Sequence, residues 1–156
     1  MFTVIIMGSP ADKDFADQIS AALDSYDIRW QLRIASAHKT PQALLDLLAE
    51  YEADAEPKVY VTVAGRSNAL SGMVDAAVTA PVIACPPYSS TFGGGDIYSS
   101  LRTPSGVAPA VVLEPKNAAL LAAKILSLHD TNLREKIEAV QTEQRERLLD
   151  ADREVR

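Results

Sequence analysis

Five short apolar runs alternate along this chain with segments whose apolar residues recur at helical spacing. The first run, 2–7, is uninterrupted and rich in β-branched residues, which is typical of a strand buried on both faces of a parallel sheet. The other four runs lie at 28–34, 59–64, 81–84 and 110–113, and helices are predicted over 12–23, 41–51, 69–78 and 117–128. Because alternating strands and helices form βαβ crossovers, the pattern predicts an α/β domain whose parallel sheet is covered on both sides.

Two segments fall outside this alternation. Residues 88–106 contain Gly93-Gly94-Gly95 and are predicted to be a loop with one helical turn over 96–101, and Asn117 is predicted to cap the helix that follows. The charged tail carries a narrow apolar stripe, which suits docking on the body as well as on another subunit. We therefore divide the chain into a domain at 1–130 and a helical tail at 131–156.

Composition excludes several classes of function. The chain has a net charge of −6 and no basic cluster in its body, so we expect no nucleic-acid partner, because such surfaces need clustered Lys and Arg. No apolar run approaches the roughly 20 residues that span a bilayer, so we expect no membrane partner either. The single cysteine, Cys85, fits a reducing compartment. With the first strand beginning at Phe2, we expect no signal peptide and a cytoplasmic protein.

Polar residues gather in the loops that follow the predicted strands. Ligands of parallel α/β sheets bind beyond the carboxyl ends of the strands, which directs attention to loops 8–12, 36–40, 65–68 and 85–95. Hydroxyls, a cation and helix amino-termini together suit a phosphorylated sugar. Ser9 and Ser36 would supply donors, Lys39 charge, and Asp12 an acceptor for ribose hydroxyls.

His38 is the only histidine in these loops. An imidazole exchanges protons near neutral pH, so His38 is the candidate general base. The plainer interpretation is a histidine that caps the following helix. Plainer interpretations also exist for the other residues: Arg66 in a structural ion pair, Cys85 as a small buried residue, and His129 interacting with a helix dipole.

Other binding classes lack their motifs. No Walker loop and no Gly-x-Gly-x-x-Gly follows the first strand, and no His, Cys and carboxylate spacing indicates a metal site. A phospho-receiver domain would need an aspartate at the end of the third strand, where this chain has Ala64-Gly65-Arg66. The residues alone therefore indicate a parallel α/β domain that binds a small phosphorylated ligand.

Taken together, the loops resemble those of the phosphoribosylaminoimidazole carboxylase family. The resemblance covers roughly residues 2–128 in order. It is carried by Met7-Gly8-Ser9 with Asp12, Ser36-Ala37-His38-Lys39-Thr40-Pro41, Ala64-Gly65-Arg66-Ser67-Asn68, Asp96-Ile97-Tyr98-Ser99-Ser100-Leu101-Arg102 and the helix that begins with Asn117-Ala118-Ala119. Ala11 departs from the family, which commonly has a serine there, so one hydroxyl contact to the nucleotide is expected to be absent.

The resemblance implies a flavodoxin-like three-layer fold, a homo-oligomer (tetramer or octamer) with sites completed by neighbouring subunits, and no metal, biotin or ATP. Carried over by position, Ser9, Asp12, Ser36 and Lys39 would bind the ribose phosphate and His38 would transfer the proton. Ser67, with the backbone of Gly65, would hold carbon dioxide. Lys39 could serve the phosphate or the developing carboxylate.

Two branches of the family differ in these loops. The mutase branch, which acts on N5-carboxyaminoimidazole ribonucleotide, has Ser-Ala-His-Arg in the second loop and a histidine in the third. Here Lys39, Arg66-Ser67-Asn68 and Cys85-Pro86-Pro87 resemble instead the branch that carboxylates 5-aminoimidazole ribonucleotide with carbon dioxide. The resemblance therefore favours this carboxylase. The alternatives are the mutase, a non-catalytic flavodoxin-like nucleotide-binding module, and an inactive homologue.

Overall fold

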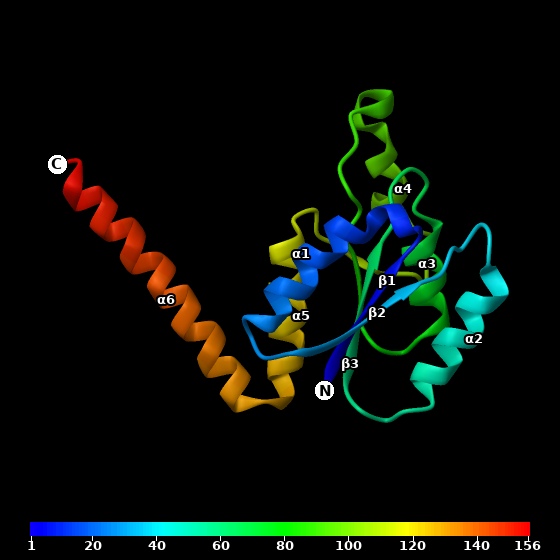
Figure 1. The fold of residues 1–156 in the computed structure, drawn as a ribbon, viewed down its shortest axis with the longest axis horizontal. Helices are drawn as coiled ribbons and strands as arrows, with labels where there is room; N and C mark the ends of the chain where they lie inside the picture. Colours follow the sequence, from blue (N-terminus) through cyan, green and yellow to red (C-terminus); the bar gives the residue numbers. More distant parts are fainter.

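A five-stranded sheet forms the centre of the molecule, which a computed structural model describes over residues 1–156 (Figure 1). The strands are β1 (Phe2–Met7), β2 (Arg29–Ile34), β3 (Lys58–Val63), β4 (Val82–Ala84) and β5 (Ala110–Val111). They lie in the order β2-β1-β3-β4-β5, and every neighbouring pair is parallel. This is the flavodoxin-like strand order. The predicted fold class is confirmed.

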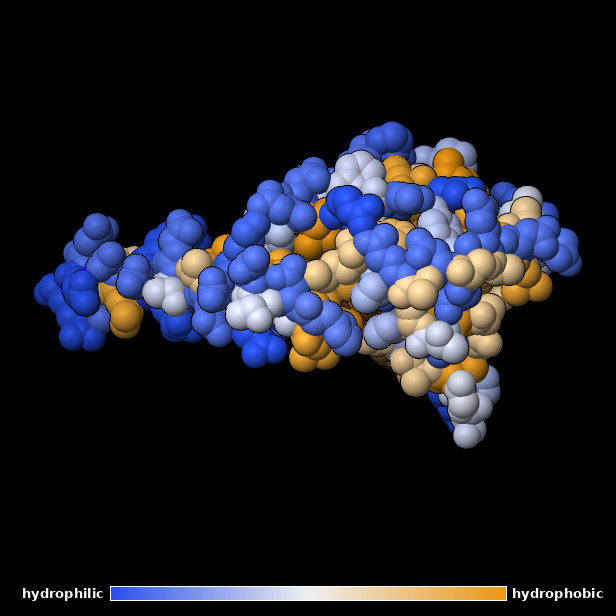
Figure 2. All heavy atoms as spheres, turned by 90° about the horizontal axis from the view of Figure 1, so that it is seen from below, coloured by the Kyte–Doolittle hydropathy of each residue, from blue (hydrophilic) through white to orange (hydrophobic).

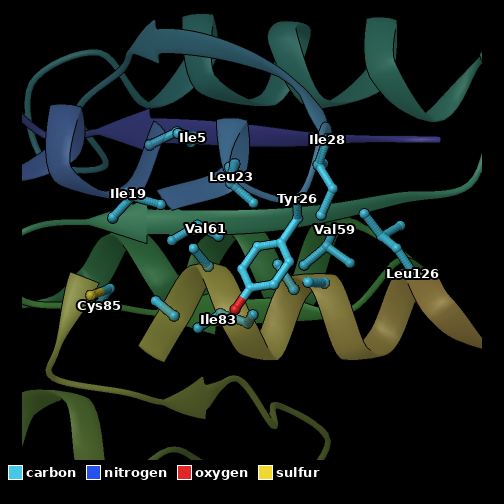
Figure 3. Close-up of a cluster of buried hydrophobic side chains, with 14 of the residues drawn as sticks. Ile5, Ile19, Leu23, Tyr26, Ile28, Val59, Val61, Ile83, Cys85 and Leu126 are labelled. Carbon is cyan, nitrogen blue, oxygen red and sulfur yellow. The ribbon is translucent and has the colours of Figure 1, made fainter. Parts of the chain in front are cut away.

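Helices cover both faces of the sheet and bury two hydrophobic clusters. α1 (Lys13–Asp24) and α5 (Pro115–Leu126) cover one face, and α2 (Pro41–Glu52) and α3 (Ala69–Ala77) cover the other. Alternate residues of β1 point to opposite faces, so Ile5 belongs to the first cluster and Val4 to the second. Figure 3 shows the first cluster, in which Tyr26 lies across the side chains of β3 and α5. Strands buried on both faces explain the uninterrupted apolar runs.

Three elements differ from the sequence-based prediction. A 3-10 turn, η1 (Pro10–Asp12), precedes α1, and a second 3-10 segment, η2 (Thr91–Ile97), precedes the short helix α4 (Tyr98–Leu101) within the predicted loop. The prediction that Asn117 caps the fifth helix is wrong, because α5 already begins at Pro115. Proline suits the first helical position, where its missing N–H is not needed for an intrahelical bond.

The charged tail forms one long helix, α6 (Thr131–Glu154), after a single 3-10 turn, η3 (Ser127–His129). Its amino-terminus is capped by Asp130, and only its first turns pack on the body, where Leu133 and Ile137 join the first cluster. The rest projects away from the body as a mainly hydrophilic arm, along which Leu148 is exposed (Figures 1 and 2). No helix of the structure combines the length and apolar character needed to cross a membrane.

A buried phenol links α2, β3 and the loop before β4. Tyr60 is fully buried and donates its hydroxyl to Glu52 (2.9 Å), which also accepts from the backbone N of Thr79 (3.0 Å) and its hydroxyl (3.1 Å). Desolvation acts to raise the pKa of Glu52, but the hydrogen bonds from Thr79 and Tyr60 and the charge of Lys58 together lower it. The ionised carboxylate is therefore the form that stabilises the fold.

We expect a Glu52→Gln variant to lose stability in a pH-dependent way. Because the pKa of Glu52 is lowered in the folded state, its contribution is fully present above the unfolded-state pKa, about 4.3. It disappears as pH falls through the lower, folded-state value. The Tm difference between wild type and Glu52→Gln should thus shrink between neutral and strongly acidic pH. Glu50→Gln, an exposed change on the same helix, is the control and should show no such trend.

Candidate active site

The loops after β1, β2 and β3 converge on one open cavity. They meet because β1 lies between β2 and β3, and the chain leaves β1 and β3 toward opposite faces of the sheet, which opens a crevice at their carboxyl ends. All seven residues predicted from the sequence line this cavity: Ser9, Asp12, Ser36, His38, Lys39, Gly65 and Ser67. Gly8, Ala37 and Ala64, which the sequence analysis quoted without a role, also line it, and Leu70 is the lining residue that sequence reasoning missed.

The first loop lies tightly against the third. The backbone N of Gly8 donates to the Val63 carbonyl oxygen (2.9 Å), and a Cβ added at Gly8 would lie 3.3 Å from the Cβ of Ala64. A side chain at position 8 would therefore push the two walls of the cavity apart. The Ser9 hydroxyl accepts a hydrogen bond from the Ala11 backbone N (3.2 Å) and keeps its own proton to donate to a ligand.

Asp12 is half-buried at the start of α1. Burial raises the pKa of its carboxyl group, although the hydrogen bond from the Ser9 backbone and the nearby charge of Arg66 act in the opposite direction. An acceptor placed here suits hydroxyl groups, as the sequence-based assignment to ribose requires. Arg66 itself forms no ion pair within the chain, so the structural ion pair considered from the sequence is not found.

The second loop is held by its own hydrogen bonds. The Ser36 backbone N donates to the Thr40 hydroxyl (2.9 Å), and the Lys39 backbone N donates to the Ser36 hydroxyl (3.2 Å). The Thr40 backbone N donates to the Ser36 carbonyl oxygen (2.9 Å). This compact turn leaves the side chains of His38 and Lys39 exposed beside the cavity.

The His38 imidazole forms no hydrogen bond with the helix that follows it. The helix-capping interpretation is therefore not supported, since α2 begins at Pro41 with Thr40 as its N-cap residue. A ring that is exposed, beside the cavity and not engaged by the protein is available for proton transfer.

A second, much smaller cavity adjoins the first. The two share Ala64, Gly65 and Arg66. The other walls of the small cavity come from the segment after β4 and from η2 and α4, and they include Pro86, Pro87, Asp96, Ile97 and Ser100. None of these five was selected as a site residue from the sequence.

Cys85 directly follows β4 and is fully buried, as its plainer interpretation predicted. Desolvation, with a smaller contribution from the negative charge of Glu114, raises the pKa of its thiol to about 12. Because the thiolate is the nucleophilic form, Cys85 is inert at neutral pH.

Comparison with known proteins agrees with this geometry. The sequence profile of the family described as AIR carboxylase matches residues 3–147. Phosphoribosylaminoimidazole carboxylase of Archaeoglobus fulgidus is 54% identical over 156 residues, which are 100% of this chain and 86% of that protein. The protein of the same name from Treponema denticola is 50% identical over 149 residues, 96% of this chain and 94% of that protein.

The fold of this chain also matches that of a solved structure. The crystal structure of Treponema denticola PurE superimposes with a TM-score of 0.97 at 48% identity and covers 99% of this chain and 98% of its own. A profile match over nearly the whole chain, with relatives at about half identity, shows common descent. The chain belongs to the AIR carboxylase family.

Proposed function

We propose that this protein carboxylates 5-aminoimidazole ribonucleotide with carbon dioxide, giving 4-carboxy-5-aminoimidazole ribonucleotide in purine biosynthesis. One observation carries the proposal. Three loops of this member of the AIR carboxylase family converge on one cavity and present there a single, unengaged imidazole, that of His38. The reaction needs a phosphate-anchored heterocycle, one proton acceptor and room for a small gas molecule.

The phosphate and ribose would be held by the first two loops. Ser9 and Ser36 keep hydroxyl protons to donate, Lys39 supplies a positive charge, and Asp12 accepts from hydroxyls. Carbon dioxide would lie against the third loop, where Gly65 contributes no side chain and Ser67 offers a hydroxyl. With the nucleotide held in this way, the reacting carbon of the base would lie between the second and third loops, beside His38.

The aminoimidazole ring behaves as an enamine, so its carbon-4 attacks carbon dioxide without an activated carrier. A carbon–carbon bond forms, and the intermediate bears both a hydrogen and the new carboxylate on carbon-4. His38 then takes this proton, the C–H bonding electrons return to the ring, and aromaticity is restored. A positioned base contributes roughly 100- to 10,000-fold, and confining carbon dioxide near the carbon adds a proximity effect.

The loops favour the carboxylase over the mutase. Lys39 stands where the mutase branch has arginine, and the third loop has Arg66-Ser67-Asn68 in place of that branch's histidine-containing sequence. An ATP-free assay distinguishes them: the protein should turn over 5-aminoimidazole ribonucleotide with bicarbonate as the source of carbon dioxide. Turnover of N5-carboxyaminoimidazole ribonucleotide alone would establish the mutase. A bound flavin, or binding without turnover, would indicate a non-catalytic module or an inactive homologue.

Lys39→Ala should raise the Michaelis constant for the nucleotide by about tenfold, the lower end expected for losing a charged hydrogen bond at an exposed site. Lys39→Arg, which keeps the positive charge, should raise this Michaelis constant by a smaller factor. Lys124→Ala, an exposed change in the last turn of α5, is the control. An unchanged Michaelis constant in Lys39→Ala would contradict the phosphate role.

We further propose a homo-oligomer, a tetramer or an octamer, located in the cytoplasm. Large side chains exposed on η2, α4 and the loop before them support self-association, because exposed apolar groups of this size are usual at protein interfaces. They are Tyr88, Phe92, Tyr98 and Leu101. Light scattering of the purified protein measures the number of subunits.

A further inference from the structure

The third loop is held in an unfavourable backbone conformation. Arg66 has a φ of +58°, in the left-handed region that residues with a Cβ rarely adopt. Such a conformation persists only where surrounding contacts hold it, and it is found most often at functional sites. Arg66 separates Gly65 from Ser67, which are the two residues assigned above to carbon dioxide.

Asn68 anchors the end of the third loop. Its side chain is only 4% exposed and lines neither cavity. Its carbonyl oxygen accepts from the Ser71 backbone N (3.2 Å) and caps α3, while its amide nitrogen donates to the Ser100 hydroxyl (2.9 Å) in α4. Both polar atoms of the Asn68 side chain are thus hydrogen-bonded within the chain.

Ser99 reinforces the same junction. Its hydroxyl accepts from the Asn68 backbone N (2.9 Å) and lies 2.7 Å from the Asp96 carbonyl oxygen and 3.2 Å from that of Arg66. Ser100 is 2% exposed, so its bond to Asn68 is shielded from water. We call Asn68, Ser99 and Ser100 the loop clamp, because they tie the third loop to α4, 32 residues further along the chain.

We infer that Asn68 is a positioning residue for carboxylation: through the loop clamp it fixes the third loop and the wall of the small cavity in the arrangement that receives carbon dioxide. This inference rests on the proposed function. The nucleotide is held by the first and second loops, which the clamp does not touch. Loosening the clamp should therefore impair the use of carbon dioxide much more than the binding of nucleotide.

The Asn68→Ser variant separates this role from capping and from direct contact, because Asn68 lines neither cavity. Asn68→Ser keeps an oxygen suited to cap α3 but is too short to reach Ser100, and Ser100→Ala removes the other partner. Each variant should raise the Michaelis constant for bicarbonate about tenfold, as expected when a buried donor or acceptor loses its partner, and leave that for the nucleotide nearly unchanged. The double variant should be no worse than either single one, because both remove the same bond.

Ser127→Ala is the control for Ser100→Ala, since it also removes a buried, hydrogen-bonded serine hydroxyl. The Ser127 hydroxyl lies in η3 and donates to the Lys124 carbonyl oxygen (2.8 Å). It should leave both Michaelis constants unchanged. If Asn68→Ser changed the Michaelis constants for bicarbonate and for the nucleotide equally, the inference would be overturned. Additive effects of the two substitutions in the double variant would also overturn it.

Hydrogen exchange followed by mass spectrometry gives a readout that does not depend on activity. Amides of 65–68 and 96–100 should exchange faster in both clamp variants than in wild type, with the sheet unaffected. Unchanged exchange in these segments would overturn the inference. Failure of the wild-type protein to carboxylate the nucleotide would instead refute the proposed function, while the exchange result still decides whether the clamp exists.

Discussion

A His38→Asn variant should retain its fold and lose roughly 100- to 10,000-fold in kcat, the range that a positioned general base contributes. Asparagine keeps a polar, planar side chain but cannot accept and release a proton near neutral pH. The side chain of His38 is exposed and makes no hydrogen bond within the chain, so replacing it removes no packing and leaves no partner unpaired. Binding of the nucleotide, which the neighbouring residues provide, should change little. The kcat and Michaelis constant measured with saturating bicarbonate separate the two effects.

His129→Asn is the matched control for this experiment. His129 is the other histidine of the chain, is also exposed, and ends η3 beside α6. It should keep wild-type activity. Near wild-type turnover in a folded His38→Asn protein, judged by circular dichroism and Tm, would show that another group moves the proton.

A Gly65→Leu variant should lose about 100-fold in kcat/KM for bicarbonate, a loss of the size caused by small displacements of reacting groups. Gly65 lies in the wall shared by the two cavities. A Cβ added there would meet nothing nearer than the Pro87 carbonyl oxygen at 3.9 Å. A larger side chain therefore fits without unfolding the protein but occupies the space assigned to carbon dioxide.

Gly65→Ala gives the graded comparison, because one methyl group fills less of that space and should cost less activity. Gly72→Ala, within α3, controls for the general effect of adding a Cβ, which there lies 3.9 Å from Val107. It should leave activity unchanged and slightly raise Tm, since alanine favours a helix over glycine. Full activity of Gly65→Leu would place carbon dioxide elsewhere.

Patterns within short segments predicted most of the fold. The buried strands β1 and β3 were identified from uninterrupted β-branched runs, and α2 was identified from Pro41 and the leucines that follow it. The alternation of strands and helices then predicted a parallel sheet. Because ligands of such sheets bind beyond the carboxyl ends of the strands, the loops that line the cavity could be predicted as well. The residues of these loops therefore came together as expected, although their roles in the reaction remain predictions.

Contacts between distant segments could not be predicted in this way. The hydrogen bond from Asn68 to Ser100 joins residues 32 apart, and nothing in either segment alone indicates it. The left-handed backbone conformation of Arg66 could not be predicted from the sequence either, because that conformation is held by neighbouring residues and is not favoured by arginine itself. The start of α5 was missed for a local reason: Asn117 looked like a cap, but Pro115 is already a favourable first residue.

The proposed reaction depends most on where the nucleotide lies relative to the His38 imidazole. A crystal structure of the His38→Asn variant with bound 5-aminoimidazole ribonucleotide, compared with the wild-type complex, measures this directly. We expect the phosphate to lie against Ser9, Ser36 and Lys39. Carbon-4 should lie within about 3.5 Å of the position that the His38 ring occupies, the separation of a reactive complex. A nucleotide bound outside this cavity, or a carbon-4 that faces away from position 38, would contradict it.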